Sequence, residues 1–372
     1  MSAVDEGSVS AETEDLSAQE RDEAEEAVSS AYQVVYAGQD FDVEGLVRRL
    51  DRGDILIPQF GHNYDQVDTA GFQRSFVWQK PQMDRFVESM LLGYPIPSIL
   101  LVRQSDRRYL VLDGQQRLRT LQYFYSGVYR DRTFSLSNVS EPFRNLTYKT
   151  LSADQRRTLD NTYIQATIVD TDGSEDSQEA IYQIFERLNS GGTQLTPHEI
   201  RVALYAGPLI DYLHSLNHDN SWRNVYGPIS PRLRDQEMVL RILALYLDEL
   251  KYFRPLKQFL NRFASEQRTA ADPRLEEAGR LFKLAASKLD GGPGSEALRR
   301  RSRILNVAQT DAVFVGLMTE LNRRDLSETQ VTEAVHAIRT DETIEPYVAT
   351  ATSNEESVAA RLHIAREHFA AV

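Results

Sequence analysis

Hydrophobic and polar residues follow two different periods in the first half of the chain. Apolar residues spaced three and four apart predict amphipathic helices over 41–54 and 80–93. Short apolar runs bounded by Pro, Gly or polar residues predict strands instead. The four predicted strands lie in ILIP (55–58), YPIPSILLV (94–102), YLVLDG (109–114) and YIQATIVD (163–170). A tight connection, RQSDRR (103–108), joins two of these strands, and a helix is expected after the second.

From about residue 175 onward the pattern is helical. One helix is predicted over 177–192, and the next begins with Thr196 as N-cap, Pro197 in the first position and Glu199 in the third. Helical spacing then recurs over 235–250, 274–289, 301–322, 328–340 and 355–371. DGGPGS (290–295) is the clearest internal linker. The predicted fold class is α+β, with a small mixed sheet domain over 31–206 and a helical domain over 207–372.

Composition and charge narrow the class of protein. The 372 residues contain no cysteine, which excludes disulfides, thiol nucleophiles and thiolate metal sites. No apolar run is long enough to span a bilayer, and the acidic start is not a signal peptide, so we expect a cytoplasmic protein. The net charge of the chain is −13, and residues 1–30, with ten acidic residues and one Arg, account for −9 of it. We expect this segment to be a disordered acidic leader, so the overall acidity does not argue against DNA binding by the folded part.

The polar corner DGQQR (113–117) has two interpretations. In the structural one, Asp113 is the N-cap of a helix, Gln116 completes a capping box, and Gly127 ends the helix. In the functional one, the helix N-terminus binds an anion, Gly114 lets the backbone approach it, and Arg117 neutralises a phosphate. Asp113 would then hold a metal ion or orient a water molecule. The residues of the corner alone do not decide between the two.

Three further polar clusters are candidates for binding. GFQRSFVW (71–78) places Gln73 and Arg74 among aromatic residues, and FERLNSGGTQLTPHEIR (185–201) contains Asn189, Gly192 and Thr193. The basic run Arg299, Arg300 and Arg301 would contact DNA phosphates or simply begin a solvated helix. No Walker A motif, H-E-x-x-H or G-x-S-x-G occurs, so a P-loop ATPase is excluded, and neither a metal site nor a serine hydrolase is predicted.

Taken together, these blocks resemble a known family. The I-P, Q-R-x-F-V-W, G-x-P-I-P, D-G-Q-Q-R and R-L-N-S-G-G-T motifs occur in the order found in the N-terminal domain of GmrSD-type modification-dependent restriction systems, which also leads SspE-type phage-defence proteins. The resemblance covers roughly 41–206 and implies a ParB/sulfiredoxin-like fold.

The resemblance also implies a function. It implies binding and hydrolysis of an NTP with Mg²⁺, coupled to sensing of modified or foreign DNA. Asp113, Arg117 and Arg74 would be catalytic. The nucleotide-binding set would be Gln73, Gly114, Gln115, Gln116, Asn189, Gly192 and Thr193.

The second half departs from single-chain members of the family. Those carry a C-terminal HNH-type nuclease domain, whereas 207–372 shows only helical patterns. We therefore expect a separate HNH-type nuclease partner, or a signal that is relayed in another way. The C-terminal helices leave homo-oligomerisation open. Two alternatives remain: a non-catalytic DNA-binding adaptor that grips a phosphate with DGQQR, and a nuclease that cuts with the ParB-like domain itself. The second would need a metal cluster that the sequence does not show.

Overall fold

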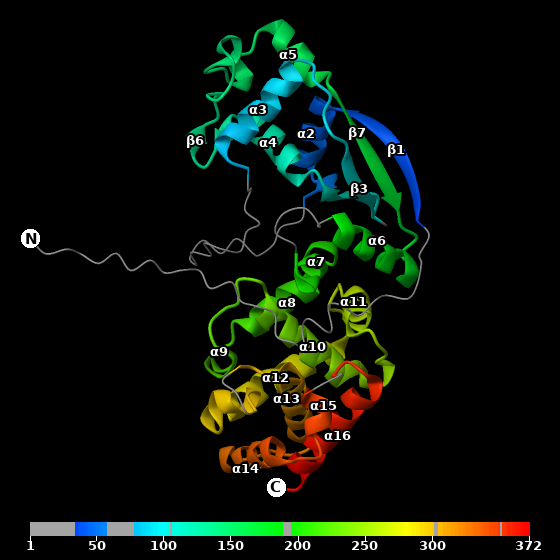
Figure 1. Cartoon of the computed structure of the whole chain (residues 1–372), viewed down its shortest axis with the longest axis vertical. Coiled ribbons are helices and arrows are strands. Elements are labelled where there is room, and N and C mark those ends of the chain that lie inside the picture. The colour runs from blue at the N-terminus through cyan, green and yellow to red at the C-terminus, as the bar shows by residue number, and fades with distance from the viewer. Residues whose placement is uncertain (1–33, 58–77, 105, 189–194, 301–303, 350–351) are drawn as a thin grey trace, which may run out of the picture.

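The computed structural model describes residues 34–57, 78–104, 106–188, 195–300, 304–349 and 352–372. Figure 1 shows an elongated molecule in two parts. The sheet part (residues 34–170) contains all of the strands among the described residues, and the helical part (residues 175–372) follows it. The predicted α+β class is confirmed. Gln73, Arg74, Asn189, Gly192, Thr193, Arg301 and the acidic leader lie outside the described residues.

A mixed five-stranded sheet forms the centre of the sheet part. Its order is β1-β7-β3-β4-β2. β1 pairs with β7, and β3 with β4, in antiparallel fashion, whereas β3–β7 and β2–β4 are parallel. The strands are β1 (Val35–Asp42), β2 (Ile55–Leu56), β3 (Ile99–Arg103), β4 (Tyr109–Asp113) and β7 (Tyr163–Asp170). The hairpin predicted at 103–108 joins β3 and β4, but β1 was not predicted.

Helices cover one face of this sheet. Leu101, Val111 and Ile168 belong to a buried cluster with apolar residues of α2, α3 and α4. These helices form where the periodicity predicted them, and α2 ends at Gly53 in the left-handed region. The elements of this layer are α2 (Val43–Arg52), α3 (Lys80–Leu91), α4 (Gln115–Ser126), β5 (Val128–Tyr129), β6 (Arg132–Thr133), η1 (Glu141–Phe143), η2 (Tyr148–Thr150) and α5 (Ala153–Asp160).

The opposite face of the sheet joins the core of the helical part. Val102, Leu110 and Val169 share one buried cluster with α6 (Glu175–Leu188), α7 (Pro197–Leu204) and the helices that follow. Since α6 and α7 pack into this cluster, the hydrophobic cores do not divide at residue 206. A domain boundary at that residue stays a prediction.

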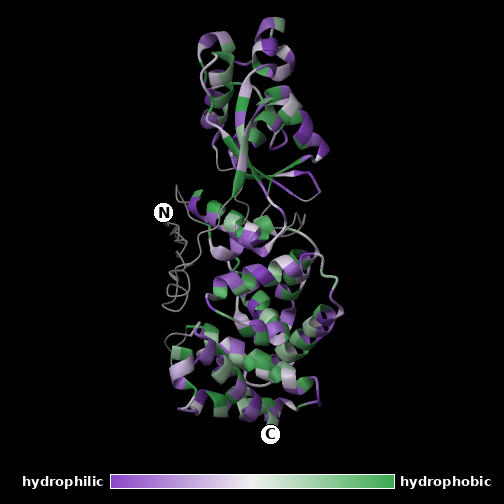
Figure 2. Ribbon diagram, turned by 90° about the vertical axis from the view of Figure 1, so that its right-hand side faces the viewer, coloured by the Kyte–Doolittle hydropathy of each residue, from purple (hydrophilic) through white to green (hydrophobic). Residues whose placement is uncertain are grey.

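The helical part is built around α13 (Val307–Leu321), in which every residue except Thr319 is buried. Hydrophobic stretches run along the strands and through the middle of the helical part (Figure 2). None of the described helices is both long and apolar enough to span a bilayer. The other elements are α8 (Pro208–Asn217), α9 (Asn220–Tyr226), α10 (Arg234–Asp248), η3 (Glu249–Lys251), α11 (Leu256–Glu266), α12 (Pro273–Gly291), η4 (Gly294–Leu298), α14 (Glu328–Thr340), α15 (Glu345–Ala349) and α16 (Glu355–Ala370).

The predicted linker at 290–295 is wrong. α12 continues to Gly291, and η4 begins three residues later. A Cβ atom on Gly292 would lie 3.0 Å from the carbonyl oxygen of Glu328 and 2.8 Å from Thr332 Oγ1. The glycines here allow α12 and α14 to approach closely, a use of glycine that composition does not separate from linker chemistry.

Candidate functional site

The DGQQR corner connects β4 to α4, but not in the way a capping box would. Asp113 is the last residue of β4, and Gly114 is the N-cap of α4, with φ of 98°. No side chain caps this helix. The pairing of β3 with β4 shifts register between Leu100 and Leu101, which places Asp113 opposite Leu100 and keeps it in the strand. The predicted capping box is therefore wrong, whereas the predicted stop at Gly127 is confirmed.

Gly114 is required by both conformation and space. Its positive φ lies in the region that side-chain-bearing residues rarely adopt. A Cβ atom at this position would also lie 2.5 Å from Cγ2 of Ile99 on the neighbouring strand. Glycine is therefore the residue that closes the corner between strand and helix without strain.

Arg117, in the first turn of α4, holds the corner together through hydrogen bonds. Its Nη2 donates to Asp113 Oδ2 at 2.7 Å, and its Nη1 donates to the carbonyl oxygens of Ser98, at 2.8 Å, and Pro97. The side chain is only 12% exposed. Arg117 thus joins the segment before β3, the end of β4 and the start of α4, and it fixes the Asp113 carboxylate in position.

Asp113 is the accessible member of this pair. Its side chain is 56% exposed, and its Oδ1 makes no hydrogen bond to any residue that the structure describes. The first intrahelical bond of α4 runs from the Leu118 N–H to the Gly114 carbonyl, so the N–H groups before it form the positive end of the helix. A carboxylate suits a hard cation, and a helix N-terminus suits an anion such as phosphate.

The corner is linked to the end of the Gln73–Arg74 segment. Gln116 Oε1 accepts a hydrogen bond from the backbone N–H of Trp78 at 3.2 Å, across 38 positions of sequence. The Trp78 ring packs edge-on against Phe86 of α3, with centroids 5.3 Å apart. Trp78 closes the GFQRSFVW motif, so the structure brings the last residue of this motif to DGQQR. Gln115 is half-buried in the same turn.

The third predicted cluster is described only at its flanks. α6 ends at Leu188, and α7 starts at the predicted N-cap, Thr196. The Glu199 N–H donates to Thr196 Oγ1 at 3.2 Å, and Glu199 Oε2 accepts from the Thr196 N–H, which confirms the predicted start. α6 shares the buried cluster of Leu112, the residue before Asp113.

Buried charges under these flanks were not predicted. Arg201 of α7 is almost fully buried, and it binds Glu237 of α10 at 2.5 Å and Asn261 of α11 at 2.7 Å. Asn261 also donates to Glu179 of α6 at 3.0 Å, and burial raises the pKa of that carboxyl. In the sequence these residues look like ordinary polar surface residues. Only the structure shows that they link α6, α7, α10 and α11.

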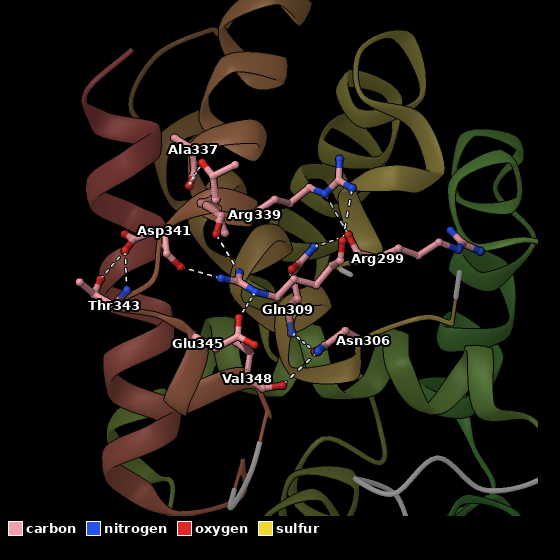
Figure 3. A network of polar contacts seen from close by, with 12 residues as sticks. Arg299, Asn306, Gln309, Ala337, Arg339, Asp341, Thr343, Glu345 and Val348 are labelled. Carbon is pink, nitrogen blue, oxygen red and sulfur yellow. Dashed lines mark hydrogen bonds and ion pairs between the residues drawn. The ribbon is translucent and has the colours of Figure 1, made fainter. Parts of the chain in front are cut away.

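The structure gives Arg300, the middle residue of the basic run, a role inside the helical part. The Arg300 guanidinium is nearly buried and binds Glu345 together with the carbonyl oxygens of Ile338 and Asp341. The Arg299 carbonyl accepts hydrogen bonds from Arg339 and Gln309, as Figure 3 shows. The prediction that Arg300 contacts DNA is therefore corrected, because its donors face the protein interior.

Basic residues are in excess in part of the layer that covers the sheet, which we call the basic layer (115–161). Residues 115–161 contain eight basic and four acidic side chains. Arg119, Arg130, Arg132 and Lys149 form no ion pair with a described residue, and the last three carry exposed or half-exposed side chains. Among the described residues, no three His, Asp or Glu side chains come together as a metal-binding group. The sequence signal for this basic layer was a local excess of positive charge inside an acidic chain.

Comparisons with known proteins agree with the motif order. Residues 47–206 match the family model described as the GmrSD restriction endonuclease, N-terminal domain. No curated protein matches this chain. A solved structure of a Pnob8-like ParB-N domain aligns over 91% of this chain and 99% of that chain at 13% identity, but its TM-score of 0.22 carries no argument about the fold. Residues 47–206 of this chain are therefore similar to the GmrSD N-terminal domain.

Proposed function

We propose that this chain is a nucleotide-binding, NTP-hydrolysing DNA sensor of a modification-dependent restriction or anti-phage system, acting with a separate HNH-type nuclease. The observation that carries the proposal is the exposed Asp113 carboxylate, fixed by Arg117 at the N-terminus of α4 within the matched domain. The family model is named for a restriction endonuclease, which supports a role in restriction or defence.

The residues of the corner fit an NTP with Mg²⁺. The α4 N–H groups would hold phosphate oxygens, and Asp113 would supply one oxygen ligand to the metal, in keeping with sites that bind Mg²⁺ through one or two carboxylates and substrate phosphates. The nucleotide would supply a cleavable phosphoanhydride. Arg117 was predicted to be catalytic, but in the proposed site it acts as a positioning residue, because its donors already bind Asp113, Ser98 and Pro97.

Residues outside the description complete the proposed site. Arg74 would stabilise charge that develops during hydrolysis. Gln73, beside aromatic residues, would line the same pocket, and Asn189, Gly192 and Thr193 would close it. The link from Trp78 to Gln116 supports placing the Gln73–Arg74 segment near the corner.

The proposed DNA contact uses the basic layer over the sheet. Arg119, Arg130, Arg132 and Lys149 have no carboxylate partner among the described residues, so they are available to DNA phosphates. This contact should weaken steeply as salt rises. Hydrolysis at the corner would then report DNA to the nuclease partner.

The test is nucleotide hydrolysis by the full chain, with and without DNA, for the wild type, Asp113→Asn and a matched control. Asp106→Asn is that control, because Asp106 is also an exposed carboxylate paired with an arginine, Arg108, at the other end of the β3–β4 hairpin. We expect DNA to stimulate hydrolysis in the wild type and in Asp106→Asn, and Asp113→Asn to lose at least tenfold. Equal turnover in both variants would overturn the proposed role of the corner.

The DNA-binding adaptor is a second candidate, and the occupied donors of Arg117 favour it. If the Arg117 clasp is purely structural, the basic layer alone would bind DNA. Nucleotide titration without DNA separates the two: the adaptor predicts no binding, and the sensor predicts saturable binding.

A further inference from the structure

The two edges of the sheet are built differently. The β2 edge is only two residues long, and a short edge strand offers little to an outside strand. β1 is eight residues long and pairs with β7 in unbroken register from Val35 to Asp42. Figure 1 shows β1 along the outer side of the sheet part. Among the described strands, only β7 pairs with β1.

β1 contributes little to the core of a single chain. Phe41 is its one buried residue, and Val35 and Tyr36 are 73% and 68% exposed. Residues 35–40 are exposed on both faces of the sheet. The strand lacks Pro, Lys, Arg and bulges, which keep many edge strands from pairing, and its charged residues are Asp40 and Asp42 alone. Its outer N–H and C=O groups therefore form a template for another strand.

We propose that β1 pairs antiparallel with β1 of a second copy of this chain, about a twofold axis that passes midway between the two Gly38 residues. This register places Val35 opposite Phe41, Tyr36 opposite Asp40 and Ala37 opposite Gln39 of the second copy. The two sheets become one continuous sheet across the dimer. The proposal is independent of the nucleotide chemistry at DGQQR.

Charge and side-chain direction favour this occupant. Both carboxylates of the strand, Asp40 and Asp42, lie in its C-terminal half, so the antiparallel register keeps them away from their copies, whereas a parallel register would oppose like charges. Directly opposite residues of an antiparallel pair project to the same face, so the helical layers of both copies lie on one side of the joined sheet. DNA is a poor occupant, because the strand carries two acidic and no basic residues.

The absence of cysteine gives a register-specific test. Gly38→Cys is tolerated by the fold, because the φ of Gly38 is not positive and an added Cβ would meet only Gln165 Nε2, at 3.9 Å. In the proposed dimer the two Cα atoms at the substituted position would lie about 5 Å apart, within disulfide range. The matched variant Asp40→Cys would place its two substituted Cα atoms about 14 Å apart, out of disulfide range.

We expect oxidised Gly38→Cys to migrate as a covalent dimer on a non-reducing gel, and Asp40→Cys to remain a single chain. Sedimentation should show the wild type as a dimer and Tyr36→Asp as a monomer, because the new carboxylate would lie opposite Asp40 of the second copy. Val128→Asp, at an exposed site on β5, should remain a dimer. A wild type that stays monomeric overturns the proposal, including the case in which β1 pairs only after a partner protein is added. A dimer in which the two cysteine variants cross-link equally also overturns it.

Discussion

Two aspartates in this chain bind arginine side chains in opposite surroundings. Asp113, at the end of β4, binds Arg117 and leaves its carboxylate open to solvent. Asp311, in α13, is fully buried and binds both Arg241 of α10, at 2.8 and 2.9 Å, and Arg361 of α16, at 2.8 Å. The buried group fixes three helices relative to one another. The exposed group is equally well placed but remains accessible to a ligand.

This difference predicts that the two regions have different roles: the buried group mainly stabilises the fold, and the exposed group mainly binds a ligand. An exposed ion pair contributes about 0–1 kcal/mol to stability, because water solvates both charges. Removing one partner of a buried group leaves charge uncompensated in the interior, which costs about 3–5 kcal/mol. Substitutions in the helical part should therefore lower stability, and substitutions at the corner should lower ligand binding.

The largest effect is expected from Asp311→Ala. Arg241 and Arg361 would stay buried without their shared carboxylate, so the free energy of unfolding should fall by about 3–5 kcal/mol. Urea denaturation measures this fall. Asp325→Ala is the matched control, because Asp325 pairs with Lys288 at the surface, and it should leave the free energy of unfolding almost unchanged. Equal losses in the two variants would contradict the comparison.

Gly114→Ala should cost about 3 kcal/mol, from the left-handed conformation and the contact with Ile99 together. Gly53→Ala measures the effect of the left-handed conformation alone, because Gly53 also has a positive φ but nothing lies within 4 Å of an added Cβ. We expect about 1 kcal/mol there. If thermal or urea denaturation gives the same loss at both glycines, the strand contact does not constrain the corner.

The buried side of the comparison also predicts a pH dependence. Burial lowers the pKa of His198 in α7 to about 4. The unfolded chain takes up this proton below about pH 6.5, whereas the folded chain does so only near 4. The neutral His198 side chain therefore contributes fully to the free energy of unfolding above pH 6.5, and this contribution is lost as the pH falls toward 4. At pH 5 the loss is about 2 kcal/mol.

His198→Phe should remove this part of the pH dependence, as measured by urea denaturation at pH 7.5 and pH 5. His336→Gln, at an exposed position of α14, should behave as the wild type does. A pH dependence that persists unchanged in His198→Phe would show that the buried imidazole is not its source.

The smallest effect on stability is expected from Asp113→Asn. The substitution keeps the shape of the side chain and removes an exposed charge, so unfolding should change by less than about 1 kcal/mol. Circular dichroism and urea denaturation measure this. A loss as large as that of Asp311→Ala would place both aspartates in the same structural class.

Sequence periodicity was enough for most elements that position the corner. α2, α3, the β3–β4 hairpin, β7 and the start of α7 lie where spacing and capping residues predicted them. β1 was missed because residues 35–40 are exposed on both faces and show no alternation. The supposed linker was misjudged because Gly291 and Gly292 serve close packing.

The candidate site was located by motif order, and its geometry was not predictable. The Arg117 clasp depends on the carbonyl oxygens of Pro97 and Ser98, which have no side-chain signature. The capping box failed because a shift in strand register keeps Asp113 in β4. The sequence does not distinguish a buried Arg300 from a surface arginine. Its partners, the carbonyl oxygens of Ile338 and Asp341, are apparent only in the structure.

The central claim is that the corner binds a nucleotide through Asp113 and the N-terminus of α4. Calorimetric titration of the full chain with ATP, GTP, CTP and UTP, each with Mg²⁺ and without DNA, tests it most directly. We predict saturable binding of at least one of them by the wild type and by Asp106→Asn, and at least tenfold weaker binding by folded Asp113→Asn. No binding by the wild type, or equal binding by both variants, would contradict the account.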